Sequence, residues 1–321
     1  MRITVSRSSQ PIIATAALGI AMFGSLVIAP FAQAPVHLNP MIETLARGEV
    51  AFGVSNEDMS LQNARALATA DLDYVYIDYE HAPMNFETLQ LFLLGMVDKA
   101  EAVRKGNPQP NVAPLARFAP YAREGGEWVV KQGLDQGLMG VIFNSVGTAE
   151  QALRNVRAMR YPQQRGSALM EPSGLRGSGP DNALWFWGVP MPEYKRHADL
   201  WPLNPAGDLI AIMMIETAEG LQNVNEIAAV PGVGGFYIGP SDLSNSLGVS
   251  PDSAETEAAI QTVLEACLEH NVPCGITAGS TDMPRRVEAG FRILGGGGVG
   301  GGLSAPIDAA IRAGRAAVNS Q

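Results

Sequence analysis

Polar side chains close several apolar, β-branched runs of this 321-residue chain. One run ends in Asp78-Tyr79-Glu80-His81, another in Arg117 and a third in Glu216, and a fourth leads into Gly239-Pro240-Ser241-Asp242. Carboxylates, a guanidinium and an imidazole are the groups needed to hold a cation, stabilise negative charge and move a proton. If these run ends meet in space, they form a candidate catalytic site.

Glu216 and Asp242 would offer hard oxygen ligands to a divalent cation and leave coordination positions open for a 2-oxo acid. Arg117 is always protonated and would add positive charge at the same oxygen of that substrate. His81 has a reference pKa near 6.5 and would carry a proton if an acidic neighbour oriented it. The alternatives are plain: a strand-end acid often caps the next helix, and a lone loop histidine is often only a hydrogen-bonded surface residue.

The elements that must position these residues follow from an alternation of short apolar runs with longer helical stretches, typical of repeated β-α units. The expected strands are Val50–Val54, Tyr74–Asp78, Val112–Arg117, Gly140–Asn144, Leu209–Glu216, Gly235–Ile238, Pro273–Thr277 and Arg292–Leu294. Eight such strands predict a single-domain α/β fold, a (β/α)8 TIM barrel, whose C-terminal strand ends form one shared mouth. An open doubly wound sheet is less suited, because no glycine-rich turn follows the first strand.

Helical periodicity separates the strands, and Asn85 and Ser253 are candidate N-caps. The expected helices include Leu61–Ala70, Phe86–Ala100, Thr148–Met159, Gly220–Ala228, Ala254–His270 and a last one near Ile307–Ala317. Residues 161–205 lack sustained periodicity and are expected to be a long loop insertion, either a lid or a subunit contact. Seven glycines in the eight residues of 295–302 are expected to follow the last strand, as an anion cradle or a flexible connection.

The first 34 residues have the features of a secretory signal peptide: two arginines, an apolar stretch and a small-residue ending. We therefore expect an exported, periplasmic protein whose barrel domain spans residues 35–321, or a membrane-anchored one if the segment is not cleaved. Without residues 1–34 the chain has 20 basic and 32 acidic residues, a net charge of −12, so nucleic acid is an unexpected partner. Cys267 and Cys274 have no metal-ligand spacing and are expected to be buried thiols.

Between about Leu45 and Ala313 the sequence resembles the HpcH/HpaI aldolase family, the class II pyruvate-dependent aldolases that cleave 4-hydroxy-2-oxo acids. The resemblance is carried by Tyr76-Ile77-Asp78-Tyr79-Glu80-His81-Ala82-Pro83, Pro114-Leu115-Ala116-Arg117, Met214-Ile215-Glu216-Thr217 and Ile238-Gly239-Pro240-Ser241-Asp242-Leu243-Ser244. It implies metal ligation by Glu216 and Asp242, enolate stabilisation by Arg117 and acid/base work by His81.

The resemblance also implies further site residues. Asp135 matches an acid that pairs with the histidine, often across a subunit interface, and Asp78 matches another acid of the site. The segment Gly239-Pro240-Ser241-Asp242 matches a substrate-binding segment in which the Ser241 backbone N–H holds the pyruvate carboxylate. Family members commonly form hexamers built as trimers of dimers, so a homo-oligomer is expected.

Two positions depart from the family near the expected substrate pocket. Strand four of relatives commonly ends in a Pro-Met pair, whereas this chain has Phe143-Asn144, and Met214 stands where several members have glutamine. These departures leave the aldehyde partner open.

Together these features predict a metal-dependent lyase that cleaves a 4-hydroxy-2-oxo acid to pyruvate and an aldehyde, using Mg²⁺, Mn²⁺ or Co²⁺. One alternative is an acyl-CoA lyase of the citrate or malyl-CoA type, which would need a basic surface for coenzyme A. The other is a non-catalytic exported protein that binds a 2-oxo acid.

Overall fold

A computed structural model of the chain describes residues 37–118 and 125–320, which belong to one compact unit. The expected signal peptide, residues 1–34, lies outside the described residues. Within residues 37–118 and 125–320, no helix has both the length and the apolar character needed to cross a membrane.

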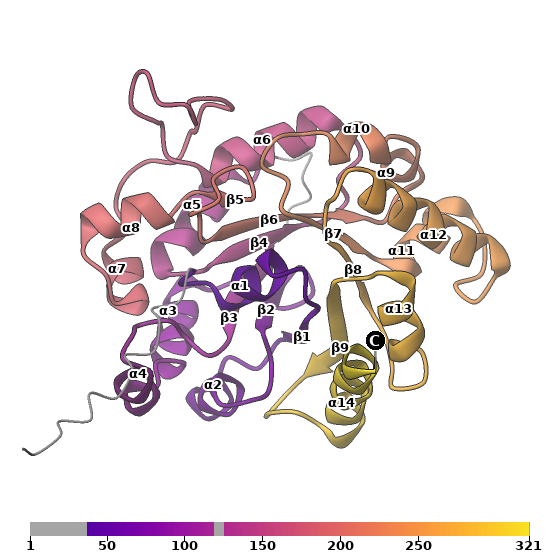
Figure 1. Ribbon diagram of the computed structural model, residues 1–321, viewed down its shortest axis with the longest axis horizontal. Helices are drawn as coiled ribbons and strands as arrows, with labels where there is room; N and C mark the ends of the chain where they lie inside the picture. The colour runs from indigo at the N-terminus through magenta and orange to yellow at the C-terminus, as the bar shows by residue number, and fades with distance from the viewer. Residues whose placement is uncertain (1–36, 119–124, 321) are drawn as a thin grey trace, which may run out of the picture. The chain divides into compact units, whose positions relative to one another are not determined.

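Eight parallel strands close into a barrel with helices around it (Figure 1). They are β1 (Ala51–Asn56), β2 (Tyr74–Tyr79), β3 (Ala113–Phe118), β4 (Gly140–Phe143), β6 (Leu209–Ile215), β7 (Gly235–Ile238), β8 (Cys274–Thr277) and β9 (Ile293–Val299). Each pairs with the next in this order, β9 pairs with β1, and the β4–β6 pairing spans the insertion. The two-residue strand β5 (Leu200–Trp201) adds to β6 outside the barrel. The predicted (β/α)8 fold is confirmed.

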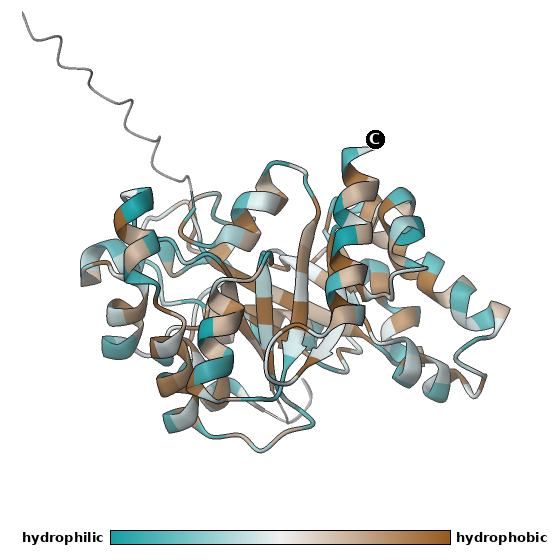
Figure 2. Cartoon of the chain, turned by 90° about the horizontal axis from the view of Figure 1, so that it is seen from below, coloured by the Kyte–Doolittle hydropathy of each residue, from teal (hydrophilic) through white to brown (hydrophobic). Residues whose placement is uncertain are grey.

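The barrel strands are apolar along their length because they are covered on both faces. Strands β2, β3, β4, β6 and β7 are buried at every residue. Hydrophilic residues lie mostly on the helices around the barrel, whereas the strands inside it are largely hydrophobic (Figure 2). This burial explains why the strands were recognisable as continuous apolar runs.

Helices lie between the strands, and two predicted N-caps are confirmed. The side chains of Asn85 and Ser253 accept hydrogen bonds from the backbone N–H groups of Thr88 and Thr256. The helices outside the insertion are α1 (Pro40–Ala46), α2 (Leu61–Ala68), α3 (Phe86–Gly95), α4 (Lys99–Lys105), α5 (Glu127–Gln136), α6 (Ala149–Met159), α9 (Ala218–Gln222), α10 (Val224–Ala228), α11 (Pro240–Leu247), α12 (Ala254–Glu269), α13 (Met283–Ala289) and α14 (Ala305–Asn319).

The insertion at 161–205 is more ordered than expected. It carries β5 and two short helices, α7 (Asp181–Trp187) and α8 (Met191–His197). Trp187 is buried, donates from Nε1 to the carbonyl of Gly137 at 2.9 Å and meets the ring of Tyr194 edge-on at 4.9 Å. Two-turn helices give too short a period to stand out in a sequence, so packing on α5 rather than local pattern defines this segment.

The glycine-rich stretch is also different from the expectation. The last strand does not stop at Leu294 but continues through the first four glycines to Val299. A Cβ on Gly295 would overlap the Tyr237 hydroxyl, which donates to or accepts from Thr277 Oγ1 at 2.7 Å. Glycine is therefore required at position 295, because the Tyr237 side chain fills the barrel interior beside it. Of the glycine-rich stretch, only residues 300–302 lie beyond the strand.

Candidate active site

The C-terminal ends of β2 and β3 carry a bidentate ion pair. Asp78 and Arg117 are direct partners in the register of the two strands, so their side chains meet once the strands pair. Arg117 donates from Nε to Asp78 Oδ1 at 3.0 Å and from Nη2 to Asp78 Oδ2 at 2.5 Å. Both residues are buried. The paired carboxylate holds the guanidinium in one orientation, as a planar fork requires.

Glu80 joins the same cluster, although the sequence analysis did not select it. Its Oε2 lies 2.9 Å from Arg117 Nη1, and its Oε1 accepts from Asn144 Nδ2 at 2.7 Å. His81 Nε2 lies 3.6 Å from Glu80 Oε2, and the histidine side chain is 58 % exposed. The sequence spacing could have indicated Glu80 as a site residue, because residues two positions apart along a strand share a face and Glu80 is two positions after Asp78.

Glu216 closes β6 as a buried carboxylate next to other acids. Its Oε1 accepts from the backbone N–H and the hydroxyl of Ser145 at 2.7 and 2.8 Å. Burial, opposed by the two Ser145 bonds and aided by the negative charges of Glu80 and Asp242, raises the pKa of Glu216 to about 7. The site therefore holds more negative charge than its own residues neutralise.

The predicted substrate-binding segment lies against this carboxylate. A Cβ on Gly239 would stand 2.6 Å from Glu216 Oε2, so glycine is needed for the close approach. Pro240 opens α11, and Ser241 and Asp242 are exposed in its first turn. Backbone N–H groups at a helix start lack partners within the helix, which suits binding of a carboxylate.

Asp135 lies apart from this cluster within the chain. It is in α5, where Arg176 Nη2 donates to its Oδ1 at 2.9 Å and Lys131 Nζ pairs with its Oδ2. Its expected partner His81 is beside Glu80 instead. Pairing of Asp135 with a histidine of a second copy stays a prediction.

The donor set at the mouth fits a divalent cation. Asp78, Glu80, Glu216 and Asp242 supply four carboxylates against the single guanidinium of Arg117. Within residues 37–118 and 125–320, no group of three or more His, Cys, Asp or Glu side chains converges as a ready metal cage. Two carboxylates with water and substrate oxygens completing the sphere are a usual arrangement for Mg²⁺.

Both departures from the family pattern contact this cluster. Asn144 is buried and holds Glu80, and Met214 Sδ lies 3.8 Å from Arg117 Nη1. Position 144 therefore contacts the acid Glu80, and position 214 contacts Arg117.

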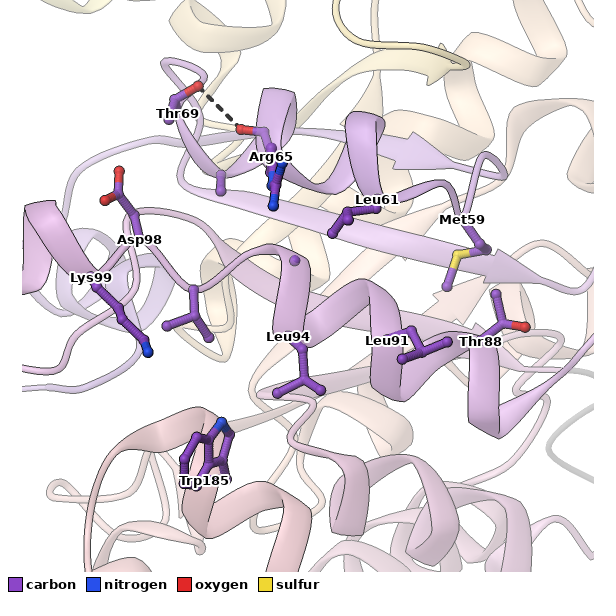
Figure 3. A pocket seen from close by; sticks show the side chains of 13 residues that line it. Met59, Leu61, Arg65, Thr69, Thr88, Leu91, Leu94, Asp98, Lys99 and Trp185 are labelled. Carbon is purple, nitrogen blue, oxygen red and sulfur yellow. Dashed lines mark hydrogen bonds between the residues drawn. The ribbon is translucent and has the colours of Figure 1, made fainter.

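A separate hollow of about 770 Å³ lies away from the strand ends. Figure 3 shows it between α2 and α3, with Leu91 and Leu94 on one side and Trp185 of α7 facing them. Its acid Asp98 caps α4 through the N–H of Glu101. This largely apolar groove is lined by a single acid, which is already engaged as a helix cap, so it lacks the paired carboxylates of the barrel mouth.

Comparison with known proteins agrees with this geometry. The family model described as HpcH/HpaI aldolase/citrate lyase matches residues 54–303, which include every barrel-mouth residue described above. The chain belongs to this family. A hydroxypyruvate/pyruvate aldolase from Delftia acidovorans is 33 % identical over 252 residues, 77 % of this chain and 81 % of that protein.

Other family members are similarly related. A 2-keto-3-deoxy-L-rhamnonate aldolase from Salmonella schwarzengrund is 30 % identical over 242 residues, 75 % of this chain and 78 % of that protein. The crystal structure of an HpcH/HpaI aldolase/citrate lyase family protein from Burkholderia cenocepacia superposes with a TM-score of 0.63 at 29 % identity, covering 85 % of this chain and 94 % of that one. These relatives support the assignment of the chain as an aldolase-family lyase.

Proposed function

We propose that this protein catalyses reversible aldol cleavage of a 4-hydroxy-2-oxo acid to pyruvate and an aldehyde, with a divalent metal. The observation that carries the proposal is the buried Glu216 close to Asp242 and Glu80, where Glu80 and Asp78 hold Arg117 in place. An arrangement of this kind matches the charge that develops on the 2-oxo oxygen as the carbon–carbon bond breaks.

Glu216 and Asp242 would hold Mg²⁺, Mn²⁺ or Co²⁺, which supplies Lewis-acid chemistry when bound. Arg117 has five N–H donors, of which three are used by Asp78 and Glu80 and a fourth by the sulfur of Met214. The remaining N–H, on Nη2, can bind an oxygen of the 2-oxo acid. The first turn of α11 at Ser241 would receive the substrate carboxylate.

Cleavage breaks the bond between C3 and C4 of the substrate. The C4 hydroxyl loses a proton and becomes the aldehyde, the bonding electrons pass to C3 as the enolate of pyruvate, and C3 then takes up a proton. His81 would exchange protons with water, a role that its exposure beside Glu80 supports. Arg117 stabilises the negative oxygen of the enolate.

The test is pyruvate release from 4-hydroxy-2-oxo acids by the purified full chain, with each metal and then with excess chelator. We expect activity that needs metal and that falls by several orders of magnitude in Glu216→Ala/Asp242→Ala. The exposed pair residue Asp308, bonded to Arg312, gives the matched control Asp308→Ala, which should be unchanged. Full activity of the double variant would overturn the metal assignment.

Proton exchange of pyruvate in deuterated water separates the enzyme from a mere binder. An enzyme that forms the enolate exchanges the methyl protons, whereas a non-catalytic 2-oxo acid binder does not. Thioester cleavage without any release from 4-hydroxy-2-oxo acids would instead favour an acyl-CoA lyase.

We also propose that the protein is a homo-oligomer, a hexamer as the resemblance implies, and that it is exported to the periplasm. Ultracentrifugation tests the first, and a monomer that is fully active would contradict it. N-terminal sequencing of the protein recovered from separated cell fractions tests the second, because an exported and cleaved chain lacks residues 1–34.

A further inference from the structure

The insertion and the residue that follows it line an open cavity of about 920 Å³ that shares no residue with the barrel mouth. It is lined by Tyr161, Pro162, Gln163, Gln164, Arg176, Gly177, Ser178, Pro192, Lys195, Arg196, Asp199, Asn204 and Ala206. Its volume is of the size that holds a small organic ligand.

The charged residues of this cavity are mostly cationic, although the chain as a whole has a net charge of −10. Lys195 and Arg196 are exposed on α8, and the ion pairs found in the described part of the chain involve neither of them. The one acid, Asp199, is buried and already bonded to Arg160 at 2.6 and 3.0 Å. A negative ligand would therefore meet a positive surface without a free opposing carboxylate.

Arg176 adds an unsatisfied group to the cavity wall. It is only 3 % exposed, and its Nη2 donates to Asp135 and to the Tyr194 hydroxyl at 2.9 and 2.7 Å. Its Nε and Nη1, and the buried hydroxyl of Tyr161, have no hydrogen-bond partner among the described residues. The guanidinium lies 4.4 Å from the centre of the Tyr161 ring. Buried donors without acceptors are rare in native proteins and destabilise the fold unless something binds them.

We propose that this cavity is a second ligand site, for a small organic anion that carries a carboxylate or a phosphate monoester. A fork-shaped guanidinium is suited to both groups, and Lys195 and Arg196 add charge at the rim. Tyr161, Pro162 and Pro192 supply apolar surface for the organic part. Arg176 also donates from Nη2 to Asp135 of α5. An anion bound to Nε and Nη1 of Arg176 would therefore be separated from α5 by this one side chain.

The proposal is tested by calorimetric titration of the full, chelator-treated protein with inorganic phosphate, glucose 6-phosphate and succinate in turn. We expect saturable binding of at least one of them, and the comparison of the three separates phosphate from carboxylate recognition. Absence of saturable binding for all three would overturn the proposal.

The variant Lys195→Ala/Arg196→Ala changes only exposed side chains and should weaken the binding at least about tenfold, since each lost charge-assisted bond is substantial. The matched control Lys99→Ala/Arg104→Ala removes the same charge from exposed positions of α4 and should bind as the wild type does. Equal affinity in the cavity variant would overturn the proposal.

Two further measurements locate the ligand. Arg176→Lys keeps the charge but loses the fork, so it should also weaken binding while circular dichroism shows an unchanged fold. Arg117→Lys changes only the barrel mouth and should leave the binding unchanged. Weaker binding in this variant would place the anion at the barrel mouth and contradict a second site.

Discussion

At the scale of single residues, the site depends on how Arg117 is held. Its nitrogens engage Asp78 on one side and Glu80 on the other, and both acids come from β2 and the residue just after it. Lysine has one ammonium and cannot form this arrangement. Asp78 and Glu80 therefore fix the orientation of the Arg117 guanidinium in addition to pairing with its charge.

Arg117→Lys should therefore lower kcat/KM for pyruvate release by about 10²–10³-fold, the usual effect of losing an oriented charge at a reacting oxygen. Arg104→Lys is the control, because Arg104 is 73 % exposed and pairs with Glu101 away from the barrel mouth. Steady-state kinetics of both variants decides the point, and near wild-type activity of Arg117→Lys would contradict the role.

Glu216 makes stability depend on pH in the metal-free protein. The pKa of Glu216 is raised to about 7 in the folded protein, whereas the ordinary pKa of a glutamate is 4.5. Between these values the folded state binds more protons than the unfolded state, so the free energy of unfolding should fall as pH rises, by roughly 3 kcal/mol in total. Glu216→Gln keeps an acceptor for Ser145 and should abolish that fall.

Denaturant unfolding with chelator at about pH 5 and about pH 8 measures this difference. Asp73 also has a pKa raised by burial and contributes in the same direction in both proteins, so the comparison with Glu216→Gln isolates Glu216. An equal pH dependence of the two proteins would show that the Glu216 carboxyl is not perturbed.

At the scale of elements, β9 shows how a strand can consist largely of glycine. Gly295 faces the Tyr237 hydroxyl of β7, across β8, inside the barrel. The barrel interior is filled by side chains, so a large residue on one strand needs a small one opposite.

Gly295→Ala should lower the free energy of unfolding by about 1–3 kcal/mol, because the added methyl group overpacks the interior. Tyr237→Phe removes the overlapping oxygen and should recover part of this loss in the double variant. Gly300→Ala has open space around its Cβ and should be near neutral. Equal unfolding midpoints for Gly295→Ala and Gly300→Ala would contradict the packing argument.

At the scale of the whole molecule, Asp208 ties the start of the described chain to the middle of the sequence. It is buried at the beginning of β6 and lies 3.1 Å from His37 Nδ1 and 2.6 Å from His197 Nδ1. It also accepts from the backbone N–H of Asn39 at 3.1 Å. One carboxylate thus joins segments up to 171 positions apart.

Asp208→Asn should lower the free energy of unfolding by about 3 kcal/mol, because the amide carries no negative charge and accepts hydrogen bonds at only one of its two terminal atoms. Asp308→Asn, in the exposed pair with Arg312, should change it by less than about 1 kcal/mol. Chemical denaturation of both variants provides the measurement, and a similar small effect in both would refute the role of Asp208 as an anchor.

Sequence information was sufficient for the barrel and for the strand-end residues Asp78, Arg117, Glu216 and Asp242. Strands buried on both faces are continuous apolar runs, and closure of a parallel barrel brings their C-terminal ends to one mouth. The family motifs then supplied roles for these residues.

Three features depended on the folded chain. The bonds of Glu80 to Asn144 and of Ser145 to Glu216 join residues 64 and 71 positions apart, and they form only when β2, β3, β4 and β6 are paired in the barrel. The pairing of Asp135 with Arg176 depends on how the insertion packs on α5. Local periodicity determines which elements form, but side-chain contacts across distant strands and insertions follow from register and packing, which no local pattern encodes.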